Sequence, residues 1–508
     1  MSQSVTNNTY DSEFCGNVPI HLINVIQPYG VLLIVEREGL KIQQASENVE
    51  KVFHASAQQV VNTPLAEYVT ASSLSALTRK FSTGLTEHIP MVWEILGNKY
   101  LVIAHSRESF YILEINIDSS DEIEEDTFVD VYQELKYAMS AIENCRTMQQ
   151  TTDTAAAELK KFSGFDKVMI YQFDEHWNGH VLSEEMERGM ESYLDFTFPA
   201  SDIPRQARDQ YLKNAYRFIP DRTYTPVKIY PVINPTSNTF LDLSDCNVRG
   251  VASVHLEYLK NMGVAASMSI RILKDGKLWG LIACHHRTAM RNSYKMCSIF
   301  ELLSNVISSR ISSLEKEEQQ NTNLFLQHHY SLLVEETYRL NDIRESFFST
   351  DSQLLHAFDA TGAMIFYQGE VRAMGEVPPQ FQVEDLLMWL HTREIRKVYS
   401  TERLEQEHDQ AADYAAIASG LLVIPINQSK DEYILLFRKE YIQVIKWGGD
   451  PGTRINFEED MKTYHPRFSF KLWQEQVQGV SRPWKSGELV MAENLRNFLF
   501  EFLNANGI

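Results

Sequence analysis

The sequence is poor in cysteine and in positive charge, and both shortages argue against whole classes of protein. Only five cysteines occur among the 508 residues, widely scattered and without any CxxC pair or metal-type spacing. This usage argues against a disulfide-built scaffold and fits the reducing cytoplasm. Lysine and arginine number 47 against 68 acidic residues, which gives a net charge of −21. A chain this acidic is a poor candidate for non-specific binding to nucleic acid.

Long apolar runs and the motifs of common catalysts are also absent from the sequence. No stretch reaches the roughly 18 apolar residues of a membrane span, and residues 1–14 lack the basic and then apolar order of a secretory signal. There is no Walker loop, kinase nucleotide-binding motif, nucleophile elbow or metal-ligand cluster. We therefore expect a cytoplasmic protein that neither crosses a membrane nor holds a metal, and that senses or binds rather than catalyses.

What is present predicts three α+β domains, since a domain takes roughly 150 residues. The first, residues 1–118, has a buried strand at residues 30–36 and a hairpin whose turn is expected at Gly97-Asn98. An almost wholly acidic run at residues 118–126 is too polar to pack and is interpreted as a linker. Residues 128–162 then show the apolar spacing of one long helix or two in series.

The second domain, residues 119–315, contains a predicted hairpin of residues 267–273 and 278–284 around Asp275-Gly276. A long irregular region rich in proline, aspartate and arginine precedes this hairpin, and irregular loops of that length are usually functional. Residues 293–344 continue a helical pattern well beyond the usual globular helix, which suggests a helix that bridges domains and pairs with a partner chain. The third domain, residues 316–508, repeats the small α+β pattern.

The most informative stretch is the loop from Phe198 to Pro204, in which two prolines bracket a single acid. Proline restricts itself and the residue before it, so Asp202 and Ile203 are held in a stiff backbone. That stiffness fixes one carboxylate in space. The carboxylate of Asp202 is equally suited to cap a helix that begins at Ile203-Pro204.

Downstream of this loop, the chain combines arginine, histidine, hydroxyl and aromatic side chains. Arginine forks match carboxylates, and hydroxyls complete such contacts. Aromatic and aliphatic walls hold a flat apolar ring system. The set therefore suits a planar, conjugated ligand that bears carboxylates. Its members are Tyr211, Arg217, Arg249, His255, Tyr258, Ser267, Ser269, His285 and His286.

Several of these stretches resemble phytochromes. The loop at residues 198–204 resembles the PASDIP signature of the phytochrome GAF domain, and residues 258–269 and 279–286 resemble its following block and closing strand. Residues 447–451 and 465–470 resemble the start and the PRxSF motif of the phytochrome tongue. Cys15, with Pro19-Ile20-His21 and Gln27-Pro28, resembles the bilin-attachment segment. The likeness runs nearly end to end and is closest to the bacteriophytochromes.

This resemblance implies an architecture and a function. It implies three tandem PAS/GAF-like domains with antiparallel sheets joined by long helices, namely PAS, GAF and PHY. The tongue, about residues 440–486, would reach back to the GAF domain. The function implied is red/far-red light sensing by a bilin, with a homodimer as the assembly. The output module would follow this chain and be a histidine kinase or a diguanylate cyclase.

The resemblance also implies a role for each candidate residue around the bilin. Cys15 would form a thioether to the chromophore, and because Val254 rather than cysteine precedes His255, the bilin would be biliverdin IXα. Asp202, through its backbone carbonyl, and His255 would lie around the pyrrole nitrogens and their water, and His285 near the D-ring carbonyl. Ile203 would also belong to the cofactor-binding set. The propionates would be held by Arg217, Arg249, Tyr211, Ser267 and Ser269. Tyr171, Phe198 and Tyr258 would wall the D-ring.

The switch residues implied by the resemblance lie in the tongue. Arg467 would pair with Asp202 in one state and Ser469 would replace it in the other, with Trp447 and Trp484 nearby. Departures from the family pattern affect the propionate side and the stability of each state: Tyr29 replaces the histidine of the familiar QPHG, and Ala252 stands where relatives carry a serine.

Two other readings of the residues stay open at this point. A GAF domain could instead sense a small molecule such as a cyclic nucleotide, although that class has no need of Cys15 or the PASDIP loop. Gly448-Gly449-Asp450 resembles the start of a GGDEF cyclase site, but Pro451 and Gly452 follow where acids are required. The sequence names neither the dark-stable state nor the direction of pairing in a dimer.

Overall fold

The computed structural model describes residues 19–82, 84, 88–117, 128–291, 294–348, 353–427, 430–451, 456–457, 464–465 and 470–505. The chain forms two compact units. The first contains Met1–Leu314 together with Lys446–Trp473, and the second contains Glu315–Ile445 and Gln474–Ile508. The linker predicted at residues 118–126 lies outside the described residues.

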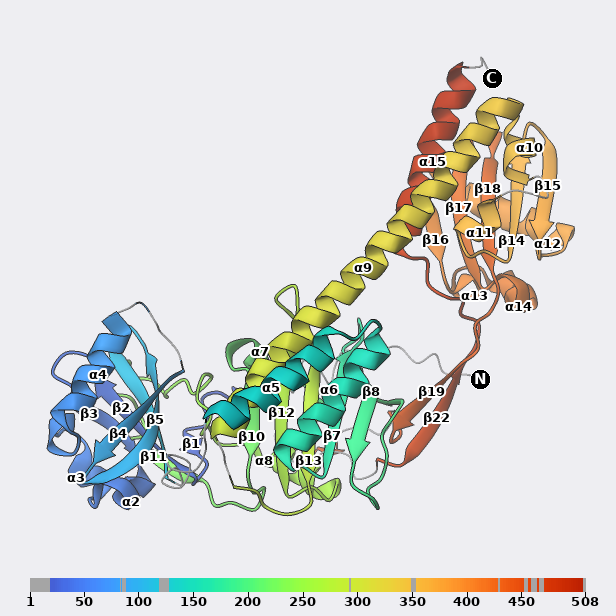
Figure 1. The fold of residues 1–508 in the computed structure, drawn as a ribbon. Helices are drawn as coiled ribbons and strands as arrows, with labels where there is room; N and C mark the ends of the chain where they lie inside the picture. Colours follow the sequence, from blue (N-terminus) through green and yellow to red (C-terminus); the bar gives the residue numbers. More distant parts are fainter. Residues whose placement is uncertain are drawn as a thin grey trace. The chain divides into compact units, whose positions relative to one another are not determined.

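The first unit begins with a seven-stranded sheet that includes one strand from far along the chain (Figure 1). β4 shows why one face is apolar, because Ile89, Met91, Trp93 and Ile95 alternate inward while their neighbours are exposed. Short helices α2 (Glu50–Phe53), α3 (Ala57–Val60) and α4 (Ala71–Ser82) accompany the sheet. Its strands, in spatial order, are β1 (Val25–Ile26), β11 (Val227–Tyr230), β3 (Ile42–Ser46), β2 (Gly30–Glu36), β6 (Phe110–Asn116), β5 (Asn98–Ser106) and β4 (Ile89–Ile95).

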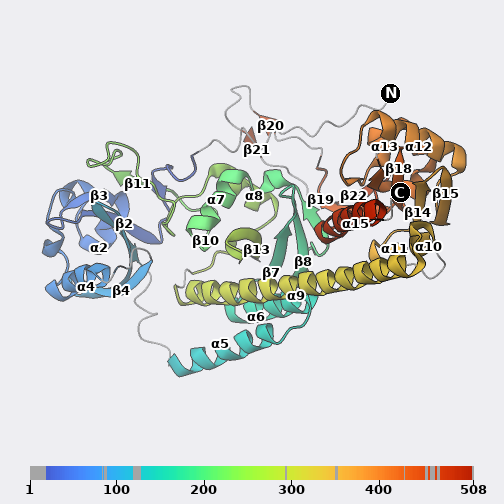
Figure 2. The same cartoon turned by 90° about the horizontal axis from the view of Figure 1, so that it is seen from above.

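A second sheet in the same unit positions the candidate site. Alternation along its central strands gives it two apolar faces. One face packs against α5 (Phe128–Glu143), α6 (Met148–Ser163) and the start of α9 (Tyr294–Leu340), and the other faces α7 (Arg205–Lys213) and α8 (Ser253–Asn261) (Figure 2). The strands, in order, are β10 (Tyr216–Ile219), β12 (Ala266–Lys274), β13 (Lys277–His286), β7 (Lys167–Phe173), β8 (Gly179–Met186), β9 (Phe196–Phe198), β19 (Gln443–Gly448) and β22 (Leu472–Val477).

The predicted tongue enters the first unit through β19. Lys446 and Trp447 pair in parallel with Phe196 and Thr197 of β9, a contact between segments about 250 residues apart in sequence. The short strands β20 (Asn456–Phe457) and β21 (Tyr464–His465) form a separate antiparallel pair. The tongue therefore reaches the GAF sheet, as the fold resemblance implies.

The second unit is a five-stranded antiparallel sheet that is covered on both faces. Along β17, Leu422 and Ile424 point to a core shared with α9 and α15 (Ser486–Ala505), while Leu421 and Val423 point to a core shared with α12 (Gln380–Thr392). Smaller helices are α10 (Ile343–Phe348), α11 (Leu354–Ala357), α13 (Leu404–Glu407) and α14 (Ala415–Ala418). The strand order is β15 (Glu370–Gly375), β14 (Gly362–Tyr367), β18 (Glu432–Arg438), β17 (Gly420–Asn427) and β16 (Tyr399–Thr401).

Most of the elements expected from sequence are present, and one turn is corrected. Residues 128–162 form two helices in series, and Lys274 pairs with Lys277 around the expected Asp275-Gly276 turn. The first hairpin turns at Leu96-Gly97 rather than at Gly97-Asn98, because Asn98 already pairs with Ile95. Both turn residues have positive φ, +48° and +84°, as a two-residue hairpin turn with the strands' own twist requires.

Candidate functional site

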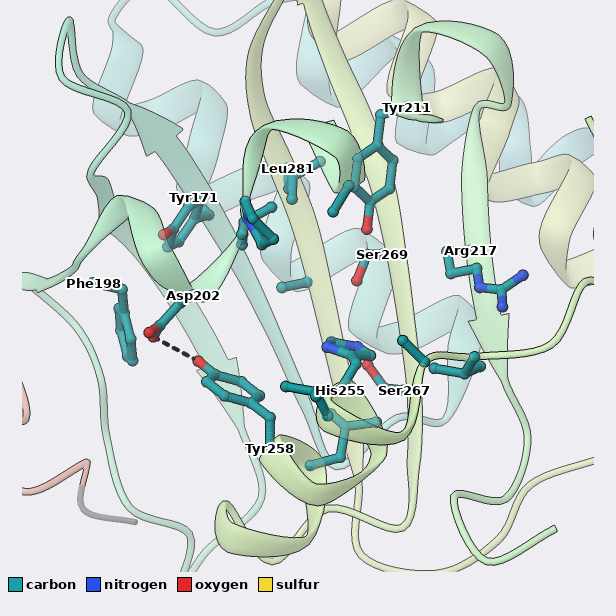
Figure 3. A pocket seen from close by; sticks show the side chains of 18 of the residues that line it. Tyr171, Phe198, Asp202, Tyr211, Arg217, His255, Tyr258, Ser267, Ser269 and Leu281 are labelled. Atoms are coloured by element: carbon teal, nitrogen blue, oxygen red, sulfur yellow. Dashed lines mark hydrogen bonds between the residues drawn. The ribbon is translucent and has the colours of Figure 1, made fainter. Parts of the chain in front are cut away.

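One cavity brings together the cofactor-binding residues predicted from sequence. It lies between helices α7 and α8 and the face of the second sheet that these helices cover (Figure 3), with an empty volume of about 1860 Å³ counted out to open solvent. Twelve predicted residues line it: Tyr171, Phe198, Asp202, Ile203, Tyr211, Arg217, Arg249, His255, Tyr258, Ser267, Ser269 and His285. His286 does not, because its ring contacts Asp166 instead, where Nδ1 accepts from the backbone amide at 3.2 Å. Cys15 lies outside the described residues.

Strand alternation explains how the floor of the cavity is built. Ser267 pairs with His285 and Ser269 with Ala283 across β12 and β13, and Leu281 pairs with Tyr171 across β13 and β7. Since residues two apart point to the same face, these side chains all face the cavity. The intervening residues, such as Met268 and Cys284, are buried in the core on the helical side of the sheet.

The proline-bounded loop holds Asp202 at the cavity wall. Ala200–Asp202 forms one 3₁₀ turn, and the carboxylate of Asp202 accepts a hydrogen bond of 3.0 Å from the hydroxyl of Tyr258 (Figure 3). The capping alternative was wrong: α7 begins at Arg205 after Pro204, and it has no side-chain cap. The carboxylate is instead directed toward Tyr258 of α8.

The two arginines are placed differently. The guanidinium of Arg217 extends away from His255 (Figure 3), and its Nη2 donates to the carbonyls of Arg249 and Gly250 at 2.5 and 2.7 Å. Arg249 donates from Nη1 to the carbonyl of Ile20 at 3.1 Å, while its buried Nε has no hydrogen-bond partner among the described residues. Burial and the neighbouring Arg217 lower the pKa of Arg249 to about 9. Arg249 is therefore the buried cation whose charge and unused Nε donor a ligand carboxylate would pair with.

Burial also sets the charge of the cavity's histidines. Burial, with a smaller contribution from Arg217, lowers the pKa of His255 to about 4, and burial with Lys167 and His255 lowers that of His285 to about 3. Both rings are neutral at pH 7 and can donate or accept a hydrogen bond. Burial raises the pKa of Tyr211, partly offset by its hydrogen bond with Ser269, so its hydroxyl stays protonated.

Aromatic rings form the wall near Asp202. Tyr171 and Phe198 have ring centroids 6.2 Å apart, and Tyr258 stacks on His255 with an interplanar angle of 11°. From the tongue, Phe470 meets Tyr258 edge to face at 5.0 Å. This wall presents flat apolar surface on both sides of the Asp202 carboxylate, as a conjugated ring requires.

The predicted switch residues divide between the two units. Trp447 is buried in the first unit on β19, whereas Trp484 belongs to the second unit's core, where Arg438 lies 3.8 Å over its ring. Arg467 and Ser469 lie outside the described residues. Their exchange at Asp202 stays a prediction.

Sequence reasoning missed several lining residues. Leu281 and Ala283 could have been found, because they alternate with His285 along one strand. Tyr193 carries no local signal of its position. Ile20, Asp450 and Pro451 belong to segments that the resemblance relates to the attachment site and the tongue, but it does not name them as lining residues. The cavity as a whole fits a planar dicarboxylate: its walls are apolar, one buried guanidinium has an unused donor, and neutral imidazoles stand at the centre.

The buried histidines predict that the apoprotein loses stability in mild acid. The pKa values of His255 and His285 in the folded protein lie below the ordinary 6.5. Below pH 6.5 the unfolded state therefore binds more protons than the folded state, and the folded state loses stability as the pH is lowered. At pH 5.5 each histidine should cost about 1 kcal/mol relative to pH 7.5. Urea unfolding of the apoprotein at the two pH values measures this. His285→Gln should reduce the pH dependence of the unfolding free energy, whereas His176→Gln, at an exposed side chain, should leave it unchanged. The same pH dependence in the wild type and both variants would contradict this prediction.

Comparison with known proteins identifies the class. Residues 15–118 match the family model for the PAS fold, residues 147–311 that for the GAF domain, and residues 326–506 that for the phytochrome region. Cyanobacterial phytochrome B of Nostoc is 35% identical over 96% of this chain and 65% of its own length, and a bacteriophytochrome of Pseudomonas aeruginosa is 31% identical over 96% and 66%. The chain thus spans less than the whole of these relatives.

Solved structures agree over the full length. The crystal structure of a bacteriophytochrome from the photosynthetic bacterium R. palustris has a TM-score of 0.84 and 32% identity, covering 97% of this chain and 99% of that one. The photosensory core module of a Stigmatella aurantiaca phytochrome gives 0.81 and 32%, covering 97% and 98%. Fold and site together define a PAS–GAF–PHY sensory module. The chain belongs to the phytochrome family. This likeness does not favour the cyclic-nucleotide alternative.

Proposed function

We propose that this chain is a red/far-red light-sensing module that holds biliverdin IXα in the GAF cavity through a thioether to Cys15. The observation that carries the proposal is that twelve residues expected from sequence to contact a bilin line one cavity. When bound, a bilin supplies the absorption of red light and a double bond that can isomerise. The protein's own residues orient it, shield it from water and respond to its change of shape.

Charge and hydrogen bonding support a bilin in particular. Arg249 offers an unused buried donor to a propionate, while Ser267 and Ser269 offer hydroxyls from the floor and Tyr211 offers one from α7. Neutral His255 can accept from, or donate to, the centre of a tetrapyrrole. His285 stands beside Ser267, where it can donate to a carbonyl.

Attachment at Cys15 is supported by reach and by elimination among the other thiols. Cys145, Cys246, Cys284 and Cys297 are buried and none of them lines the cavity, and Val254 stands where other phytochromes carry an attachment cysteine. Ile20 lines the cavity. An extended chain of five residues spans about 17 Å between Cα atoms, and a linker of that length would let a thiol at position 15 reach a chromophore in the cavity.

Signal output would begin at the Asp202 wall. Tyr258 contacts both Asp202 and the tongue residue Phe470, and Asp450 and Pro451 of the tongue line the cavity. A change of shape at this wall would bias two arrangements of the tongue, which is what a ligand-driven switch requires. Exchange of Arg467 for Ser469 at Asp202 would be that change.

The assembly and the output are part of the same proposal. The long α9 carries exposed apolar side chains such as Leu302, Leu324 and Tyr338, and a helix of this kind pairs well with a second copy of itself. We expect a homodimer, and an output module, a histidine kinase or diguanylate cyclase, downstream in the full-length protein. Size-exclusion chromatography with light scattering tests the first expectation.

The test of the proposal is an absorption spectrum of the apoprotein mixed with biliverdin, before and after red light, for wild type and Cys15→Ser. We expect a red band that shifts reversibly toward far red. Pigment should stay with the denatured wild-type chain and be lost from Cys15→Ser, because only the wild type can form a thioether. Cys246→Ser, a buried thiol outside the cavity, is the matched control and should retain the pigment.

Either component of the proposal can fail by itself. Pigment that survives denaturation in Cys15→Ser would remove the attachment site but keep the photoreceptor. Absence of any red band in folded wild-type protein would remove the bilin altogether.

A further inference from the structure

A buried, irregular segment, Asp245 to Gly250, lies between β11 and α8. It has neither helix nor strand of its own, yet all of its residues are buried. Its Arg249 and Gly250 line the bilin cavity. Because buried backbone groups must find partners, the position of this segment is set by whatever supplies its hydrogen bonds.

Many of those partners come from the PAS domain. The amide of Gln27 donates to the carbonyl of Val248 at 2.7 Å, and the amide of Gly250 donates to the carbonyl of Val25 at 2.8 Å. The hydroxyl of Tyr29 donates to the carbonyl of Asn247 at 2.8 Å. Tyr29 is the residue that replaces the family's usual histidine, so this last contact is a feature of this chain's own sequence.

A buried carboxylate of the PAS sheet makes the central contact. Glu114 of β6 is 3% exposed, and its Oε2 accepts from the backbone amide of Val248 at 2.8 Å. Its Oε1 lies 2.6 Å from Nε2 of His105, which is fully buried on β5. Strand register places His105 opposite Ile112, two residues from Glu114, so the two side chains are diagonal neighbours on one face.

The surroundings of this pair are apolar. That face of the PAS sheet, with Leu32, Ile34 and Ile112, packs against Leu243 and Val248, which lie between β11 and α8. A carboxylate in such a place is costly unless both oxygens are satisfied. Glu114 meets that condition only with His105 on one side and the amide of Val248 on the other, which fixes the segment against the PAS sheet.

The same segment is tied on its other side to the cavity. Arg217 donates to the carbonyls of Arg249 and Gly250, and Asn214 donates to the side-chain oxygen of Asn247 at 2.9 Å. The guanidinium of Arg249 then extends to the carbonyl of Ile20, with its Nε unused. A continuous set of contacts therefore joins the Glu114–His105 pair to the cation of the cavity.

We propose that Glu114, oriented by His105, and Tyr29 are positioning residues that aim Arg249 at a bilin carboxylate, so that the PAS domain tunes ligand recognition in the GAF domain. The inference rests on the proposed bilin function. If one contact from the PAS domain is lost, the segment Asp245 to Gly250 can shift, and the charge-assisted hydrogen bond from Arg249 to the bilin carboxylate is weakened. The apolar walls of the cavity are unchanged.

The experiment compares biliverdin with biliverdin dimethyl ester, whose propionates carry no charge. Both are titrated into proteins with the Cys15→Ser background, so that binding is reversible. Glu114→Gln keeps the shape of the side chain but removes the charge and one acceptor. We expect it to weaken binding of biliverdin roughly five- to tenfold and to leave that of the dimethyl ester within about twofold.

Two further variants separate positioning from general damage. Glu94→Gln makes the same chemical change at an exposed position of β4 in the same sheet and should alter neither ligand. Tyr29→Phe removes only the hydroxyl that donates to Asn247, and it gives a second, milder test should Glu114→Gln fail to fold. We expect it to weaken biliverdin roughly threefold, again without affecting the ester.

The outcomes separate this inference from the function beneath it. The positioning role would be overturned if the variants weakened binding of both ligands equally, or if neither Glu114→Gln nor Tyr29→Phe changed binding. In both cases biliverdin would still bind the parent protein. Failure of the parent protein to bind biliverdin would overturn the proposed function and this inference with it. Selective loss of biliverdin binding supports both.

Discussion

Replacing Arg438 by methionine should destabilise the second unit by about 3–5 kcal/mol, the range for breaking one side of a buried ion pair. Arg438, at the end of β18, is 4% exposed and its Nη2 donates to Glu488 of α15 at 2.8 Å. Glu488 is itself buried, so the variant would leave an uncompensated carboxylate in the core. Domains are commonly stable by only about 5–15 kcal/mol, so the loss is a large fraction of the total.

Arg438 also satisfies backbone groups that nothing else reaches among the described residues. Its guanidinium donates to the carbonyls of Phe358 at 2.6 Å and Pro483 at 2.7 Å, and it lies 3.8 Å over the ring of Trp484. Lysine cannot reproduce this fork. Arg438→Lys should therefore recover only part of the loss, although it restores the charge.

Denaturant unfolding followed by tryptophan fluorescence measures this effect, because Trp484 lies directly beneath the guanidinium. Arg496→Met is the control. Arg496 lies on α15, the helix that carries Glu488, and pairs there with Glu493 at 2.7 Å in a half-exposed setting. That control should cost less than about 1 kcal/mol. A difference of less than 1 kcal/mol between the two methionine variants would show that the buried pair is not what holds α15 to the sheet.

The features easiest to predict from the sequence were those determined by residues that are neighbours in the chain. The Phe198–Pro204 loop owes its stiffness to its own prolines, and Ser267, Ser269 and His285 share a face because of strand periodicity. Such features can be deduced from neighbouring residues alone. These features, together with the resemblance to phytochromes, which implied the remaining lining residues, are why the GAF cavity could be predicted more fully than its supports.

Features that depend on distant partners could not be predicted. β11 joins the PAS sheet although it lies more than a hundred residues beyond that sheet's other strands, and Glu114 resembles an ordinary acid on a half-exposed strand until Val248 is seen beside it. The capping interpretation of Asp202 failed for the same reason, since Tyr258 is 56 residues away. Arg217 was predicted to hold a propionate; its contacts here are with backbone carbonyls, and the prediction remains for binding experiments to decide.

The second large effect is expected at Arg249. In the Cys15→Ser background, Arg249→Met should weaken binding of biliverdin roughly 10- to 100-fold, the equivalent of about 1.5–3 kcal/mol for a hydrogen bond to a charged group. The dimethyl ester should be affected less than about threefold, because it offers no carboxylate. Titration followed by the red absorption band gives both constants. Arg205→Met, at an exposed side chain of α7, is the matched control and should change neither.

Although Arg249→Met should weaken binding of biliverdin, it should not destabilise the ligand-free protein. Arg249 is buried, its pKa is lowered to about 9 by burial and by Arg217, and no carboxylate pairs with it among the described residues. Removing a buried cation of this kind is neutral or stabilising by about 1 kcal/mol or more. Arg249→Met should therefore unfold at equal or higher urea concentration without ligand, yet gain less stability than the parent protein when biliverdin is added. A variant that is less stable without ligand and binds both bilins equally poorly would mean that Arg249 supports the fold rather than the carboxylate, and Arg217 would then be the cation to test.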